Sequence, residues 1–237
     1  MKDYLQKSFY KCVELFVAHG SAYAFNFFTI FEDDDIWVLD KPAGLLSVDG
    51  RVLKVSLQSR LLKVNPHIKL IHRLDMDTSG LIIFAKNALA QSHICKQFID
   101  RLPLKEYQAL VFGKLIGDGS VNVPVRYEPT TKPRHIVDLA WHKHALTHYR
   151  VLSCETYQDT QGHAHDVTRV ALNPVTGRSH QLRVHMTHLG HVMLGDPIYA
   201  TGSALSLSPR LCLHAHKLRL KHPTEGTWLS WQSDVPF

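Results

Sequence analysis

Strand-like and helix-like runs follow one another along this chain without a regular strand–helix–strand rhythm. Strands are predicted within 27–40 and at 81–85, 105–112, 145–152, 168–172 and 211–220, where apolar or β-branched residues cluster. Helices are predicted at 55–62, 87–98 and 179–189. Because a doubly wound sheet needs steady alternation, the pattern predicts an α+β fold instead. Its central, mainly antiparallel mixed sheet is expected to be flanked by helices and loops.

The length of the chain, 237 residues, is enough for one large domain with its own apolar core. Residues 1–26 are predicted to form an irregular or helical N-terminal extension, and residues 27–237 the main domain. Within that domain, the stretch 117–143 is rich in proline, charge and histidine. Such a composition predicts short strands and a mobile loop.

Charge and cysteine content narrow the class of protein. The chain has 27 Lys and Arg against 21 Asp and Glu, a basic balance that suits a nucleic-acid partner but also occurs in ordinary enzymes. Its four cysteines are scattered without a CxxC pair, which favours reduced thiols in a cytoplasmic protein. No segment reaches the roughly 18 apolar residues of a membrane span, so no membrane partner is expected.

The densest polar cluster lies at 72–80, immediately before an apolar run. It contains two carboxylates, an arginine, a histidine and two hydroxyls. Arg73 is two residues from Asp75, and a carboxylate beside a guanidinium stays ionised. An ionised aspartate can act as a nucleophile or a general base. The alternative is a turn in which these side chains bond to local backbone groups.

A second polar cluster, at 176–185, lies at the start of a predicted helix. Arg178, Gln181 and Arg183 could bind RNA phosphates there, since helix N-termini also favour anions. Arg183 could instead be buried and paired with a carboxylate such as Asp75. A solvated basic face is the simplest alternative.

Lys105 and Tyr107 form a third candidate, because a tyrosine beside a cation could stack on an extruded base. An ordinary strand aromatic is the alternative. His-x-His pairs at 142/144, 163/165 and 214/216 lack a companion cysteine or carboxylate at a familiar spacing, so no metal is predicted. Walker, GxGxxG and GxSxG patterns are absent from the sequence, and no nucleotide cofactor is expected.

Several motifs, taken in order, resemble the RluA family of pseudouridine synthases. The segment 72–80 is similar to the family signature, and 105–107 to its K-x-Y motif. The other matching segments are 40–48, 176–185, 194–199 and 211–215. The resemblance covers 27–237 and implies the family fold, a mixed α/β domain whose active cleft crosses a mainly antiparallel sheet.

This resemblance implies a role for each of five residues. Asp75 matches the catalytic aspartate, Tyr107 the tyrosine that packs against the target base, and Arg183 the arginine that pairs with the aspartate. Arg73 matches a residue that helps to rearrange the RNA, and Leu213 a residue that lines the pocket. Four further residues in the motifs are expected to contact RNA: His72, Lys105, Arg178 and Gln181.

The implied reaction converts uridine to pseudouridine in structured RNA and needs no cofactor. The chain resembles the short family members without an S4 domain, in particular one that acts on 23S ribosomal RNA and on the anticodon stem-loop of several tRNAs. It departs from them within 117–143 and at His144, where lysine is common. The RNA target therefore stays open, with a single rRNA or tRNA site as an alternative. A glycosidase and a non-catalytic RNA-binding module are rival functions, and a cytoplasmic monomer is expected.

Overall fold

The computed structural model describes residues 11–12 and 28–237. Its strands are β1 (Lys11–Cys12), β2 (Phe28–Glu32), β3 (Ile36–Lys41), β4 (Lys69–Leu70), β5 (Ser79–Ala85), β6 (Leu104–Phe112), β7 (Gly119–Asn122), β8 (Val125–Tyr127), β9 (His135–Val137), β10 (Leu146–Gln158), β11 (Ala164–Pro174), β12 (Leu213–Lys221) and β13 (Trp228–Gln232). Its helices are α1 (Leu57–Val64), α2 (Ala88–Ile99), α3 (Gln181–His188) and α4 (Gly202–Ser206), with a 3-10 turn η1 (Pro129–Thr131).

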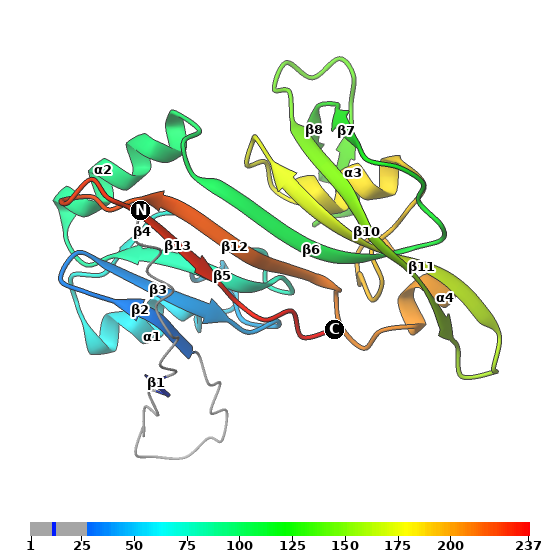
Figure 1. Cartoon of the computed structure of the whole chain (residues 1–237), viewed down its shortest axis with the longest axis horizontal. Coiled ribbons are helices and arrows are strands. Elements are labelled where there is room, and N and C mark those ends of the chain that lie inside the picture. Colours follow the sequence, from blue (N-terminus) through cyan, green and yellow to red (C-terminus); the bar gives the residue numbers. More distant parts are fainter. Residues whose placement is uncertain (1–10, 13–27) are drawn as a thin grey trace, which may run out of the picture.

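One large sheet organises the molecule (Figure 1). Its strand order is β1-β2-β3-β5-β12-β6-β11-β10-β7, with β13 paired to β12 and β4 paired to β5. Among the described strands of this sheet, β5 and β12 run parallel and every other pairing is antiparallel. The short strands β8 and β9 form a separate ribbon. The predicted α+β fold with a mainly antiparallel mixed sheet is confirmed.

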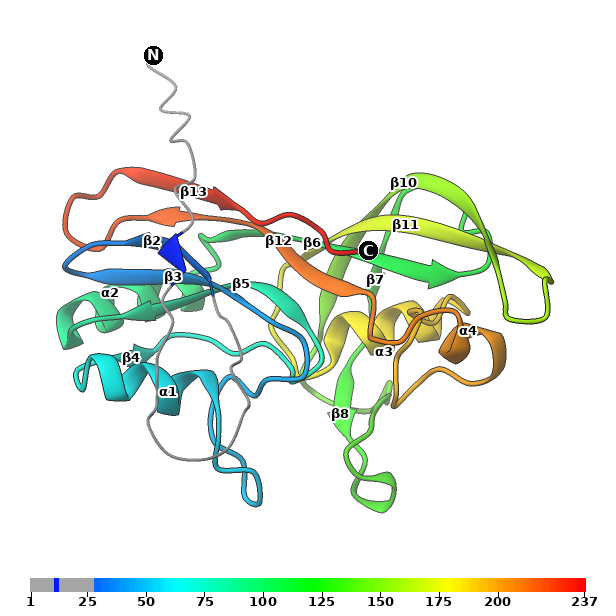
Figure 2. The ribbon, with the colours of Figure 1, turned by 90° about the horizontal axis from the view of Figure 1, so that it is seen from below.

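Helices α1 to α4 and the β8–β9 ribbon lie on one face of this sheet (Figure 2). Under one half, Leu57 and Leu61 of α1 pack in an apolar cluster with Trp37 of β3. Under the other half, Met186 of α3 packs in a second cluster with Leu172 of β11. Burial of such side chains is the main free-energy gain that holds helices to a sheet.

The parallel pairing of β5 with β12 depends on Gly80. This residue has a φ of +108°, and a Cβ atom there would lie 2.4 Å from the carbonyl oxygen of Ala215. Only glycine allows both that conformation and so close a backbone approach. The glycine that ends the 72–80 cluster therefore fixes β5 beside β12, and the preceding polar residues form a loop at the middle of the sheet.

Several boundaries differ from those expected. Strands β10 and β11 form a long antiparallel pair that extends well beyond the predicted 145–152 and 168–172. Strand β13 and helix α4 were not predicted. Short strands do occur within 117–143, as expected.

The expected N-terminal extension, 1–26, is described only at β1, which pairs with β2. The prediction for its other residues lies outside the described part of the chain. Among residues 11–12 and 28–237, no helix combines the length and apolar character required to cross a membrane.

Candidate active site

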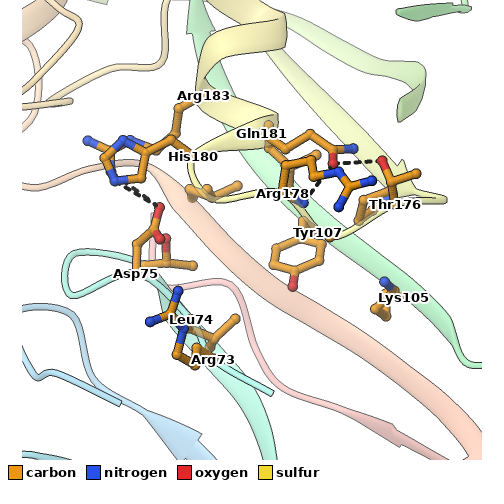
Figure 3. Close-up of a pocket in the computed structure, with 15 residues that line it drawn as sticks. Arg73, Leu74, Asp75, Lys105, Tyr107, Thr176, Arg178, His180, Gln181 and Arg183 are labelled. Carbon is orange, nitrogen blue, oxygen red and sulfur yellow. Dashed lines mark hydrogen bonds and ion pairs between the residues drawn. The ribbon is translucent and has the colours of Figure 1, made fainter. Parts of the chain in front are cut away.

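A pocket opens at the middle of the sheet, between the loop that precedes β5, strand β6 and the start of α3 (Figure 3). Residues from four distant parts of the sequence meet there because β5, β12, β6 and β11 are consecutive neighbours in the sheet. Eight of the nine predicted site residues line this pocket: Arg73, Asp75, Lys105, Tyr107, Arg178, Gln181, Arg183 and Leu213. The ninth, His72, does not.

Arg183 joins two carboxylates at one wall of the pocket. Its Nε and Nη2 atoms donate to the two oxygens of Asp196, at 2.8 and 2.6 Å. Its Nη1 atom lies 3.3 Å from Oδ2 of Asp75. Figure 3 shows the Asp75 carboxylate directed toward this guanidinium. Asp75 and Arg183 are therefore in contact, as predicted. Asp196 is a second partner of Arg183 that the sequence did not predict.

Burial differs sharply among these three side chains. Those of Arg183 and Asp196 are 2% and 1% exposed, whereas that of Asp75 is 28% exposed. Burial disfavours the charge on Arg183, but the carboxylates of Asp196 and Asp75 outweigh it and raise the pKa of the guanidinium. Asp196 therefore compensates the buried cation, and Asp75 is left facing the open pocket.

Gln181 anchors the start of α3. Its amide nitrogen donates to the Leu146 carbonyl and the Thr147 hydroxyl, both at 3.0 Å. Its amide oxygen accepts from the Thr176 hydroxyl and the Arg178 backbone, at 2.7 and 3.0 Å. The side chain is buried and its amide is fully occupied. Gln181 therefore positions α3, which the sequence did not predict, and its expected RNA contact stays a prediction.

The loop that carries Asp75 is tied to the lysine–proline segment after β3. Lys41 is fully buried, and its ammonium donates to the Met76 carbonyl at 3.0 Å and to two nearby carbonyls. Gly44 donates its N–H to the same Met76 carbonyl, and Ser47 bonds to both backbone groups of Leu74. Burial lowers the pKa of Lys41 to about 7. The segment 40–48 is one of those that resemble the family motifs, but the resemblance implied no role for Lys41.

Tyr107 lies on β6, with its ring between the two apolar clusters. Burial, followed by the negative charge of Asp75, raises the pKa of its hydroxyl well above the usual range. The phenol therefore stays neutral, and among the described residues it makes no hydrogen bond. Leu213 on the neighbouring strand β12 is buried beside it and lines the same pocket. Together they give the pocket an apolar floor.

His180, the residue that precedes α3, faces Asp75. Its Nε2 atom lies 3.9 Å from Oδ2 of Asp75, and its Nδ1 atom lies 2.8 Å from the Tyr199 hydroxyl. That hydroxyl accepts the His135 N–H, so its own proton is free to point to Nδ1. Burial lowers the pKa of His180 to about 4. The ring is thus neutral near pH 7, and the sequence did not reveal that it lies beside Asp75.

His72 has a different position from the one expected. Its Nε2 atom accepts the Ile83 N–H at 3.2 Å, and its ring stacks on Phe98 with centroids 5.2 Å apart. Burial, followed by the charge of Lys105, lowers the pKa of His72 to about 3. A neutral ring engaged inside the fold is not an RNA-contacting cation. We therefore reassign His72 to a supporting role behind β5.

The remaining predicted cations are open to a ligand. Arg73 and Arg178 are exposed at the rim of the pocket. Lys105 lies 5.8 Å from the centroid of the Phe98 ring, and burial lowers the pKa of its ammonium. Among the described residues, none of the three cations forms an ion pair with a carboxylate. They are free to meet an anion.

The histidine pairs do not gather into metal sites in the described part of the chain. His163 and His165 both contact Asp159, at 3.3 and 3.0 Å. His214 bonds to Ser79 and Ser233 inside the sheet. Residues 11–12 and 28–237 contain no group of three or more potential ligands arranged to hold a metal ion.

The pocket therefore combines an accessible carboxylate, a buried guanidinium that contacts it, a flat apolar floor and a cationic rim. A carboxylate held beside a cation stays ionised and can serve as a nucleophile or a base. The apolar floor suits a planar base, and the cationic rim suits phosphates.

Comparisons with known proteins agree with this chemistry. A family model described as RNA pseudouridylate synthase matches residues 35–188. The dual-specificity RNA pseudouridine synthase RluA of Pasteurella multocida (strain Pm70) is 45% identical over 208 residues, covering 86% of this chain and 91% of that protein. Its namesake from Escherichia coli (strain K12) is 39% identical over 211 residues, covering 88% and 93%. A solved structure of human RNA Pseudouridylate Synthase Domain Containing 1 has a TM-score of 0.76 and 27% identity, covering 92% of this chain and 87% of that one.

Proposed function

Because the chain belongs to the RNA pseudouridylate synthase family, we propose that Asp75 is the carboxylate with which it isomerises uridine to pseudouridine in RNA. One observation carries this assignment. Asp75 is the carboxylate that both lines the pocket and receives the buried guanidinium of Arg183, at 3.3 Å. Asp196 also contacts that guanidinium but is buried and caps the following backbone, so it cannot meet a substrate.

The reaction breaks the C1′–N1 glycosidic bond, turns the uracil, and joins C5 to C1′. The hydrogen at C5 leaves as a proton and N1 gains one, so the atoms balance without redox change. Three routes begin from ionised Asp75: attack on C1′, addition to the ring, or removal of the C2′ proton to give a glycal. Each requires an unprotonated carboxylate within reach of the flipped nucleotide.

The neighbours of Asp75 divide the remaining work. Arg183 keeps the carboxylate charged and oriented, and Asp196 compensates the buried guanidinium. Tyr107 and Leu213 hold the planar base while it turns, since a neutral aromatic ring offers a stacking surface without anchoring the base through its hydroxyl.

RNA binding relies on the cationic rim. Arg73, Lys105 and Arg178 contact phosphates near the flipped uridine, which offsets the few kcal/mol that flipping costs. Because each phosphate contact releases counterions, binding weakens with rising salt concentration. Arg73, on the exposed end of the Asp75 loop, also rearranges the RNA around the vacated position.

The substrates of the enzyme include 23S ribosomal RNA and tRNA anticodon stem-loops. Support comes from relatives at 45% and 39% identity that are named dual-specificity RNA pseudouridine synthases. Residues 27–237 act as the catalytic domain. A monomer suffices, since Asp75, Tyr107 and Arg183 all come from one chain. The scattered cysteines favour a cytoplasmic location.

The test of this function is to map pseudouridines in ribosomal RNA and tRNA from cells with and without the protein. We expect sites to disappear from both RNA classes and to return when the wild-type chain is supplied. Loss from one class alone would mean a single-target enzyme. Unchanged maps, with RNA binding but no turnover by the purified protein, would mean a non-catalytic binder. Release of free uracil would instead mean a glycosidase.

A further inference from the structure

The pocket that contains Asp75 and Tyr107 is called the base pocket below. A second cavity adjoins it where α2 ends. We call it the α2 groove and define it by Phe98, Arg101, Leu104, Lys105, His148 and Asn173. Its floor comes from three neighbouring strands, since β6, β11 and β10 follow one another in the sheet. His148 and Asn173 face each other across β10 and β11, and the Asn173 amide donates to the Lys105 carbonyl at 3.0 Å.

The α2 groove is continuous with the base pocket. Lys105 and Pro174 line both cavities. Side chains two residues apart on a strand share a face and lie about 6.6 Å apart along it, so Lys105 follows Tyr107 along β6. An RNA strand that places a base over Tyr107 can therefore continue directly into the groove.

The walls of the groove suit a nucleotide. Phe98 and the exposed Leu104 offer apolar surface, and Arg101 and Lys105 offer positive charge. Among the described residues, neither cation is paired with a carboxylate. The neutral ring of His72 stacks behind Phe98, which keeps this wall in place. Apolar surface beside unpaired cations is the combination that binds single-stranded RNA.

The backbone at Arg101 gives an independent reason to assign function. Helix α2 ends in a Schellman motif, with Leu102 N–H bonded to the Gln97 carbonyl at 3.0 Å and Arg101 N–H to the Phe98 carbonyl at 3.3 Å. This motif places its penultimate residue in the left-handed region, where glycine is usual. Arg101 occupies that position with a φ of 58°. An arginine in a left-handed conformation that favours glycine supports a functional hypothesis for that position.

We propose that the α2 groove binds a nucleotide adjoining the target uridine in the substrate RNA, with its phosphate held by Arg101 and Lys105. The sugar or base of that nucleotide packs against Phe98 and Leu104. This assignment rests on the proposed function, because the base pocket must hold the target uridine of the same strand.

The test compares Arg101→Gly with the wild type, on an RNA stem-loop that the wild-type enzyme modifies. Loss of one phosphate contact should raise KM and the RNA Kd by roughly 2- to 12-fold, with kcat unchanged. The slope of log K against log salt should become shallower by about 0.7–1. The melting temperature should stay the same or rise, because glycine relieves the left-handed strain.

Two further variants sharpen the result. Arg101→Lys keeps the charge and should retain most of the affinity. Lys96→Ala removes an exposed charge from α2 outside the groove and should leave KM and the salt slope near wild-type values. Unchanged KM in Arg101→Gly, or an equal loss in Lys96→Ala, would overturn the groove assignment. A failure of the proposed function is distinct, since the wild-type protein would then form no pseudouridine at all.

Discussion

Arg183 and Asp196 form a buried two-point ion pair, with nitrogen–oxygen distances of 2.8 and 2.6 Å. The pair leaves Nη1 of Arg183 free to contact Asp75. The Asp196 carboxylate also accepts two backbone N–H groups, which hold it in position independently of Asp75. The orientation of Asp75, the proposed catalytic carboxylate, thus depends on a second carboxylate that is buried outside the pocket.

Replacing Asp196 should therefore impair both stability and turnover. In Asp196→Asn the guanidinium of Arg183 loses its buried counter-charge, and breaking such a pair costs about 3–5 kcal/mol. We expect denaturant titration to show that loss and kcat to fall at temperatures where the variant is folded. Glu155→Gln, which breaks the more exposed pair with Arg169, should cost less and leave kcat unchanged. Wild-type kcat in Asp196→Asn would contradict the claim that Asp196 orients Asp75 through Arg183.

Substitutions at Tyr107 separate its ring from its hydroxyl. The hydroxyl bonds to no described residue, so Tyr107→Phe should retain most of kcat/KM. Tyr107→Ala removes the stacking surface, which is worth about 1–3 kcal/mol per base, so kcat/KM should fall roughly 5- to 150-fold. Steady-state kinetics on a modified stem-loop would measure both. Equal losses in the two variants would show that the hydroxyl, rather than the ring, does the work.

Lys41 should matter for turnover although it lies outside the pocket. Lys41→Met removes the donor to the Pro42 and Leu45 carbonyls and one of the two donors to the Met76 carbonyl. A buried carbonyl left unsatisfied costs about 1–3 kcal/mol. The Asp75 loop should loosen, lowering kcat with little change in KM. Lys217→Met, which removes a half-exposed lysine paired with Glu106, is the matched control. A Lys41→Met enzyme with normal kcat would show that the loop needs no such anchor.

Acid should destabilise the fold through buried neutral histidines. Burial lowers the pKa of His72 to about 3, whereas a histidine in the unfolded chain titrates near 6.5. Between these values the unfolded state binds a proton that the folded state does not, so the free energy of unfolding falls as pH falls from about 6.5 to 3. Above pH 6.5 this contribution is constant.

Chemical denaturation at pH 7, 6 and 5 would measure this dependence. In His72→Gln the free energy of unfolding should fall less steeply with acid than in the wild type. His67→Gln, at an exposed position, should keep the wild-type dependence. Identical slopes in the wild type and His72→Gln would contradict a neutral, partly buried His72.

Sequence patterns predicted those parts of the fold where local composition decides the structure. The buried, β-branched run of β5 and the apolar core of β6 were recognised within one or two residues. The outer parts of β10 and β11 were missed because their side chains are largely exposed and polar, so their pairing with each other decides their conformation. Strand β13 is short and follows a polar turn, which hides it in the same way.

For the site, the motifs predicted which residues gather but not what each one contacts. Asp75 and Arg183 are brought together by the sheet across 108 positions of sequence. Asp196 lay within a matched motif, but only its distances reveal that it binds Arg183. His72 and Gln181 are polar residues within the matched motifs, and sequence cannot tell whether such a side chain faces the pocket or the interior.

The central claim is tested most directly by single turnover of Asp75→Asn on an RNA stem-loop labelled with tritium at C5 of uridine. Joining C5 to C1′ releases that label, so tritium in water reports the reaction, and a parallel titration reports RNA binding. We predict no release by Asp75→Asn with binding retained, and normal release by Asp77→Asn, which removes the neighbouring carboxylate. Release by Asp75→Asn at the wild-type rate would contradict the assignment of Asp75 as the catalytic group.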